Sequence, residues 1–231
     1  MPLTPKVKYR NELKYFVNNS DIWALKNRLR YIMKKDKNVL PDGTYKIRSL
    51  YFDNVYDTAL KEKEDGICDR EKFRIRIYND SDSFIRLEKK LKHNGLTHKA
   101  SEKMTREQVE AIIAGDYSWL KDAESPLFNE LYFNMSAKGL KPKTIVQYKR
   151  EPYIYPYGNV RVTIDSDLET GVNSTELFNK ELLTVPVMQN GKTILEIKYD
   201  EYLPDIIRTF VQVGSRERIS ASKYEMCRIY Y

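Results

Sequence analysis

The chain has 231 residues, of which 41% are hydrophobic, so it is long enough for one domain with a buried core. Its net charge of +7 favours an anionic partner: nucleic acid, a phosphorylated metabolite or a membrane surface. No apolar run spans a bilayer, the N-terminus lacks a signal-peptide core, and two histidines exclude a histidine-rich metal site. We expect a single cytoplasmic domain over residues 1–231, not inserted in a membrane.

Residues typical of helix ends, together with apolar residues at helical spacing, indicate five helices. The clearest follows Ser20-Asp21, a pair that suits an N-cap, and continues to Lys35. Two others begin at a capping box, Thr105-x-x-Gln108, and at Ser125-Pro126, where proline takes the first helical position. The expected helices cover residues 22–35, 58–64, 105–115, 125–139 and 204–212.

The remaining regular segments alternate charged and apolar residues with the two-residue period of a strand. In residues 72–78, one parity is basic at Lys72, Arg74 and Arg76, and the other parity is Phe or Ile. Similar alternation marks the expected strands at residues 12–15, 84–90, 145–150, 160–165 and 193–199. The segment 92–99 contains glycine, so we assign His93 and His98 to a solvated turn between strands.

The charged parity of these strands has two interpretations. A half-buried antiparallel sheet ordinarily carries polar residues on its wet face. Here, however, strand after strand repeats lysine and arginine with single carboxylates between them, and Ser, Asn and Gln are scarce. If the strands close into a barrel, this parity could face inward, where unpaired charges would be costly without a polyanion. A linear triphosphate with a divalent metal would neutralise such an interior.

An ordered series of motifs resembles a known family. The motifs are Glu12-Leu-Lys-Tyr15, Ile47-Arg-Ser-Leu-Tyr-Phe-Asp53, Lys61-Glu-Lys-Glu-Asp-Gly66, Phe73-Arg-Ile-Arg-Ile-Tyr78, Leu87-Glu-Lys-Lys90, Val146-Gln-Tyr-Lys-Arg150, Val160-Arg-Val-Thr-Ile-Asp165, Leu195-Glu-Ile-Lys-Tyr199 and Ser222-Lys-Tyr224. Together they are similar to the catalytic domain of vacuolar transporter chaperone (VTC) polyphosphate polymerases in its short bacterial form. That domain belongs to the CYTH-like triphosphate tunnel metalloenzymes.

The resemblance implies an α+β fold, an antiparallel β-barrel tunnel open at both ends with helices packed outside. It also implies a metal-dependent polyphosphate polymerase, which transfers the γ-phosphate of ATP to a growing polyphosphate chain inside a cationic tunnel. The expected ligands are therefore ATP and polyphosphate or triphosphate, with a divalent cation, Mn²⁺ or alternatively Mg²⁺.

The resemblance also implies the site residues. Catalytic or phosphate-binding roles fall on Lys14, Arg74, Arg76, Lys90, Arg150, Arg161, Lys198 and Lys223. A further phosphate-binding lysine is Lys99, with Lys103 as its alternative. Glu196 is the implied metal ligand. Glu12 and Glu88 stay open between additional metal ligands and partners that hold the arginines, and Asp165 is interpreted as a structural acceptor.

Three alternatives to the polymerase remain open at this point. The same tunnel could hydrolyse triphosphate or polyphosphate, with water in place of phosphate as the attacking group. A non-catalytic polyphosphate- or nucleotide-binding module could instead regulate a separate membrane protein. Nucleic-acid binding ranks last, because it requires basic residues on an outer face interleaved with aromatics, whereas the strand parity points to one interior.

Overall fold

The computed structural model describes residues 9–189, 191–214 and 216–229. Residues 1–8 and 230–231 of the expected domain lie outside this described part. The strands are β1 (Asn11–Val17), β2 (Lys34–Lys35), β3 (Tyr45–Asp53), β4 (Arg70–Tyr78), β5 (Ser81–His93), β6 (Leu96–Met104), β7 (Lys141–Tyr155), β8 (Val160–Thr170), β9 (Val185–Pro186) and β10 (Thr193–Tyr199). The α-helices are α1 (Asn19–Ile32), α2 (Thr58–Glu64), α3 (Arg106–Ala114), α4 (Pro126–Lys138), α5 (Asp205–Phe210) and α6 (Lys223–Arg228).

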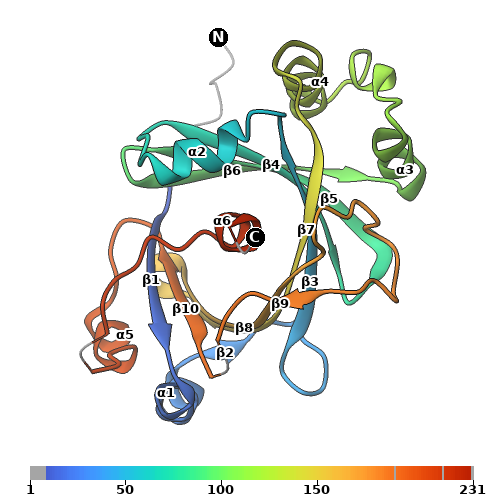
Figure 1. The fold of residues 1–231 in the computed structure, drawn as a ribbon. Helices are drawn as coiled ribbons and strands as arrows, with labels where there is room; N and C mark the ends of the chain where they lie inside the picture. Colours follow the sequence, from blue (N-terminus) through green and yellow to red (C-terminus); the bar gives the residue numbers. More distant parts are fainter. Residues whose placement is uncertain (1–8, 190, 215, 230–231) are drawn as a thin grey trace.

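The strands form one antiparallel sheet in the order β1-β10-β8-β7-β3-β4-β5-β6, with β2 paired to β7 and β9 to β8. The sheet curls until its two edge strands approach each other (Figure 1). Two hydrogen bonds join these edges, from Arg10 N to Thr97 O at 2.9 Å and from Thr97 N to Arg10 O at 3.1 Å. The predicted α+β fold with a curled antiparallel barrel is confirmed.

The apolar parity of the strands faces outward, and helices cover it. On one side, Ile75 and Leu87 pack in the same cluster as Val109 of α3 and Leu131 of α4. On another side, the apolar residues of β8 and β10 pack against α1 and α5 in a second cluster. Because successive side chains of a strand point to opposite faces, this packing directs the charged parity into the curl. The interpretation in which the charged residues of the strands face the interior of a barrel is therefore confirmed.

Three local predictions are corrected. The first helix ends at Ile32 instead of Lys35, and Lys34–Lys35 form the short strand β2. Residues 96–104 form strand β6, and only Asn94-Gly95 makes the turn from β5, with φ values of 45° and 82° that suit a tight hairpin. His93, at the end of β5, and His98, in β6, thus lie in strands rather than in a solvated turn. From the sequence, Lys223 of the Ser222-Lys-Tyr224 motif is interpreted as the last position of the charged strand pattern, but it begins α6. This helix lies inside the ring of strands (Figure 1), unlike the helices that cover the outer face.

Candidate functional site

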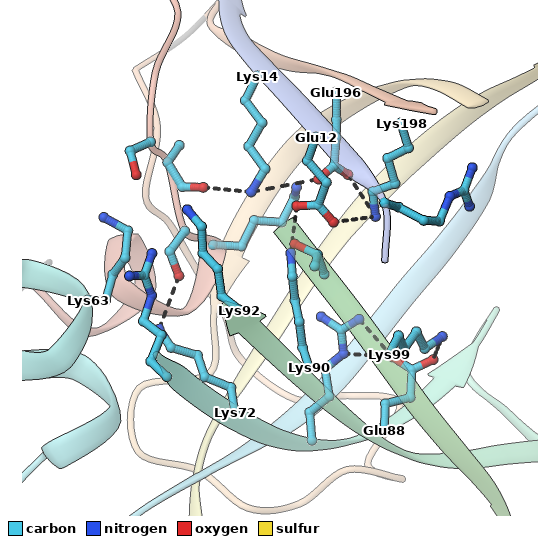
Figure 2. A pocket seen from close by; sticks show the side chains of 18 of the residues that line it. Glu12, Lys14, Lys63, Lys72, Glu88, Lys90, Lys92, Lys99, Glu196 and Lys198 are labelled. Atoms are coloured by element: carbon cyan, nitrogen blue, oxygen red, sulfur yellow. Dashed lines mark hydrogen bonds and ion pairs between the residues drawn. The ribbon is translucent and has the colours of Figure 1, made fainter. Parts of the chain in front are cut away.

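The inner face of the curled sheet surrounds a cavity of about 760 Å³. Among the described residues, fourteen lysines and arginines and three glutamates line it, contributed by most of the long strands, by α2 and by the C-terminal segment. Figure 2 shows their side chains converging from several strands. Eight of the expected basic residues lie in this lining, seven from the strands and one from α6: Lys14, Arg74, Arg76, Lys90, Lys99, Arg150, Lys198 and Lys223. The three expected glutamates, Glu12, Glu88 and Glu196, also lie in it.

Glu88 of β5 is the centre of one group of cations. Its Oε2 accepts from Nε and Nη2 of Arg74 at 2.8 and 2.7 Å and lies 3.6 Å from Nη1 of Arg76, while Oε1 accepts from Lys99. Burial alone would raise the pKa of Glu88, but the charges of Arg76, Arg74 and Lys99 outweigh it and hold the pKa far below its ordinary value. Tyr51 fixes the other side of Arg74, whose Nη1 donates to the tyrosine hydroxyl at 2.7 Å.

Glu12 of β1 and Glu196 of β10 form a second group. Nζ of Lys198 lies 3.5 Å from both carboxylates, Lys90 donates to Glu12 at 2.7 Å, and Lys14 lies 3.7 Å from Glu196. Burial opposes ionisation of Glu12, yet Lys198 and Lys90 lower its pKa to about 2. Burial also lowers the pKa of Lys90 to about 7, although Glu12 partly offsets this. Two carboxylates thus stay charged side by side among lysines.

The third group is organised by Asp165 of β8. Its two oxygens accept from Nε and Nη2 of Arg150 at 2.6 and 2.7 Å, and Nζ of Lys223 lies 2.7 Å from Oδ2. Nη2 of Arg150 also reaches Glu196 at 3.3 Å, which links this group to the second. The bidentate geometry orients the guanidinium, so Asp165 acts as the structural acceptor that the sequence indicated.

Helix α6 reaches the cavity because Tyr224, the second residue of this helix, is anchored to the wall. The Tyr224 hydroxyl donates to Asp53 at 2.6 Å, and its ring stacks on Tyr51 with centroids 5.1 Å apart. Asp53 also accepts from the backbone N–H of Ala59 at 2.9 Å, at the start of α2. One buried carboxylate therefore joins β3, α2 and α6, and it places Lys223 over the cavity.

Two of the expected lysine and arginine positions lie elsewhere. Arg161 is not in the cavity lining; its Nη2 donates to Asp36 at 2.9 Å and to the Tyr45 hydroxyl at 2.6 Å. Lys103, the alternative to Lys99, also lies outside the lining and is exposed. In the β5–β6 register, Lys99 is opposite Lys90, whereas Lys103 is opposite Arg86, further along the strand.

The cavity also contains cations that the sequence interpretation did not select. Arg70, Lys72 and Lys92 share the inward parity of Arg74 and Lys90, so strand alternation could have found them. Lys63 of α2 and Arg218 of the C-terminal segment follow no strand pattern. Lys63 lies in the motif Lys61-Glu-Lys-Glu-Asp-Gly66, but the resemblance assigns no role to it. The tyrosines Tyr51 and Tyr148 complete the wall next to the arginines.

The donor set determines how a divalent cation would fit. Within the described part of the chain, no group of three or more His, Cys, Asp or Glu residues is arranged to hold a metal. Mg²⁺ is commonly bound by one or two carboxylates together with substrate phosphates and water. Glu12 and Glu196, which share Lys198, fit that pattern. Glu88 is engaged by Arg74, Arg76 and Lys99, which fits a partner of the cations better.

A family model for the VTC domain matches residues 9–230. Among solved structures, the chain is similar to a putative adenylyl cyclase from Hippeastrum described as having a dominant triphosphatase activity. The two share 15% identity and a TM-score of 0.57 over 96% of this chain and 95% of that one. At this identity the likeness concerns the fold.

Two further structures have lower TM-scores. A putative adenylate cyclase from Bacillus halodurans has 14% identity and a TM-score of 0.48, over 90% of this chain and 94% of that chain. A protein from Pyrococcus horikoshii OT3 has 16% identity and a TM-score of 0.45, over 92% and 95%. No curated protein matches the sequence.

None of the helices in the described residues has the length and apolar character needed to cross a membrane. The curled antiparallel sheet with its cationic interior has the triphosphate tunnel fold that the motifs implied. Since the family model spans nearly all of the sequence, the chain belongs to the VTC domain family.

Proposed function

We propose that this protein is a metal-dependent polyphosphate polymerase, which transfers the γ-phosphate of ATP to a growing polyphosphate chain inside the cavity. The observation that carries this proposal is the convergence of fourteen lysines and arginines on one cavity that contains three glutamates. Phosphoryl transfer needs little covalent participation by the protein, and it depends on alignment and on neutralisation of charge. A polyanion is the ligand class that such a lining neutralises.

The groups of the cavity divide this work. Arg74 and Arg76, held by Glu88 and Tyr51, present planar N–H donors that suit phosphate oxygens. Arg150 of β7 and Lys223 of α6, oriented by Asp165, supply further positive charge. Glu12 and Glu196 would hold a divalent cation, Mn²⁺ or Mg²⁺, which would neutralise charge on the transferred phosphoryl group.

A hydrolase is the second candidate, and the fold likeness to the Hippeastrum protein described as a triphosphatase favours it. The cavity serves either reaction, because only the attacking group differs. A non-catalytic polyphosphate- or nucleotide-binding module, acting with a separate membrane protein, is the third candidate function.

Both cysteines, Cys68 and Cys227, are free, which agrees with a reducing compartment, and we place the protein in the cytoplasm.

The test is incubation with ATP and Mn²⁺ or Mg²⁺, followed by separation of the products on a gel. Long phosphate chains support the polymerase, released orthophosphate supports the hydrolase, and binding without turnover supports the non-catalytic module. If a folded sample shows no turnover and no binding of ATP or polyphosphate, all three candidate functions are contradicted.

Glu196→Gln sharpens this assay. We expect it to lower metal-dependent turnover by about 10²-fold or more, because it removes a carboxylate beside the reacting phosphates. The matched control is Lys37→Gln, an exposed side chain outside the cavity lining, which should leave turnover unchanged. Thermal unfolding of both variants separates loss of activity from loss of fold.

A further inference from the structure

Helix α1 carries two aromatic rings on its solvent side. Leu25 and Leu29 of this helix are fully buried and pack against the barrel. Trp23 and Tyr31 of the same helix are 73% and 74% exposed. The two rings are separated by slightly more than two helical turns, or about 12 Å along the axis, and both leave the helix on the side away from the leucines. Large exposed rings on one face are typical of an interaction surface.

The segment that contains these rings is strongly basic. Residues 18–40 hold six lysines and arginines and two aspartates. Asp21 pairs with Arg216 at 2.8 Å. Asp36 is buried and pairs with Arg161 at 2.9 Å. The exposed charged residues of this segment are all lysines or arginines.

Three of the cations in this segment keep their charge available. Glu151 pairs with Lys26 at 2.5 Å and with Lys35. Arg28 turns toward α5, where its Nη2 donates to the carbonyl of Gln212 at 2.8 Å. Within the described residues, the other three form no ion pair: Arg30, Lys34 and Lys37. An external anion can therefore approach them without displacing a carboxylate of the protein.

We call Trp23, Arg30, Tyr31, Lys34 and Lys37 the α1 face. Arg30 holds the Tyr31 ring in place, because its Nη2 donates to the tyrosine hydroxyl at 2.9 Å and its guanidinium carbon lies 4.9 Å from the ring centroid. Lys34 and Lys37 follow shortly after the end of the helix at Ile32. The α1 face thus combines two exposed rings with three cations.

The opposite side of the barrel has the reverse charge. Residues 105–130, which contain α3 and the start of α4, hold two basic and six acidic residues. Figure 1 places α1 and the region of α3 and α4 on opposite sides of the ring of strands. An anionic surface would attract the side that carries α1 and repel the side that carries α3. The charge distribution therefore favours one orientation on such a surface.

We propose that the α1 face docks this protein on the surface of a membrane that contains anionic lipids. A lysine or arginine near such a surface is attracted by the headgroups, and each one strengthens partitioning by about fivefold. Trp and Tyr rings are enriched at the level of the headgroups, where the apolar part of the ring leaves water and its polar atom stays hydrated. The contact is superficial, because the apolar side of α1 remains buried against the barrel.

The composition of the α1 face distinguishes this partner from a protein or a nucleic acid. The core of a protein–protein interface is depleted in lysine, whereas three of the five residues here are cations. Proteins that bind single-stranded nucleic acid lead its backbone through a groove, whereas this face is the convex outer side of one helix. An anionic lipid surface offers negative headgroups and an apolar layer together, so it matches the cations and the rings at once.

Co-sedimentation of the full chain with lipid vesicles tests the proposal. Vesicles of phosphatidylcholine alone are compared with vesicles that also contain phosphatidylglycerol, at low and at high salt. We expect binding to the mixed vesicles to be tighter by about tenfold or more and to weaken as salt rises. If a folded sample does not bind the mixed vesicles, the proposal is overturned.

The variant Trp23→Ser/Arg30→Gln removes one ring and one cation from the α1 face. We expect it to bind the mixed vesicles more weakly by about tenfold or more. The matched control, Phe133→Ser/Lys138→Gln, removes an exposed ring and an exposed lysine of α4 and should bind as the wild type does. Unchanged affinity of the first variant, or an equal loss in the control, would overturn the docking. Thermal unfolding verifies that both variants are folded, since exposed substitutions shift it little.

Arg74→Gln separates the α1 face from the cavity. If headgroup phosphates were bound inside the cavity, this variant would lose vesicle binding as Trp23→Ser/Arg30→Gln does, and the proposal would be overturned. Unchanged vesicle binding supports the α1 face. Turnover of ATP in solution should be the same in Trp23→Ser/Arg30→Gln as in the wild type, because both residues lie outside the cavity lining. If the wild type turns over no ATP, the polymerase fails and the docking is judged on vesicle binding alone.

A DNA oligonucleotide tests the other class of anionic partner. If the wild type binds it more tightly than the mixed vesicles and Trp23→Ser/Arg30→Gln loses that binding, the α1 face is a nucleic-acid site and the proposal is wrong. Weaker binding of the oligonucleotide than of the vesicles supports the lipid surface.

Tryptophan fluorescence locates the contact independently. The chain has two tryptophans, and Trp119 packs beside Phe128 with ring centroids 5.4 Å apart. Emission from the exposed Trp23 ring should move to shorter wavelength when the ring leaves water. We expect the mixed vesicles to cause this shift in the wild type and not in Trp23→Phe. A shift of the same size in Trp23→Phe would contradict the docking.

Discussion

The two faces of strand β4 are both largely buried but are balanced in different ways. On the outer face, Phe73, Ile75 and Ile77 are at most 2% exposed and pack against helices. On the inner face, Arg76 is 5% exposed, and it and Arg74 are balanced by Glu88 and by tyrosine hydroxyls. No ligand can replace the apolar contacts of the outer face, whereas a bound phosphate can replace or join the anionic partners of Arg74 and Arg76 on the inner face. Stability therefore depends mainly on the outer face, and ligand response on the inner face.

The largest change in stability is expected from Ile75→Ala, which tests the outer face. Ile75 is fully buried between the sheet and helices, so its truncation leaves a cavity and should cost about 2–5 kcal/mol of unfolding free energy. Denaturant unfolding measures this value. Ligand affinity of the fraction that remains folded should match the wild type, and a selective loss of affinity without destabilisation would break the comparison.

Arg74→Gln, one residue earlier, tests the inner face. We expect turnover to fall by about 10²–10³-fold, because a donor aimed at the phosphate path is lost. Glu88 keeps Arg76 and Lys99 as partners, so the loss of stability should be smaller than that of Ile75→Ala. Arg74→Lys serves as the conservative control and should retain part of the activity, since it keeps the charge without the planar donors. Full activity of Arg74→Gln would contradict the assignment of ligand binding to the inner face of β4.

The smallest effect is expected from Lys72→Met, read as stability against pH. Below about pH 8 the folded protein holds the Lys72 charge against burial, which costs stability. Between about pH 8 and 10.5 the unfolded chain binds this proton and the folded protein does not, so this lysine's penalty fades as pH rises. The variant should therefore be more stable than the wild type at pH 7 and should lose that advantage toward pH 10.5. Denaturant unfolding across this range checks the difference, and a variant less stable at pH 7 would contradict it.

The inward-facing residues of single strands could be predicted from the sequence. Alternation places Lys14, Arg74, Lys90 and Glu196 each opposite a mainly apolar parity, and the structure brings all four to the cavity. The same rule, applied without selection, would have included Lys72 and Lys92. This part succeeds because the two-residue period is a local property of the strand backbone.

The tertiary structure decided which inward residues meet. Arg161 has the inward parity, yet Asp36 and Tyr45 bind it outside the cavity lining. Lys63 enters from a helix, and Lys223 enters because Tyr224 is anchored to Asp53, 171 positions earlier in the chain. Such placements depend on contacts between distant segments, which no local pattern encodes. The sequence alone determined the chemistry of each strand face, and the closure of the sheet decided which of those faces share one ligand.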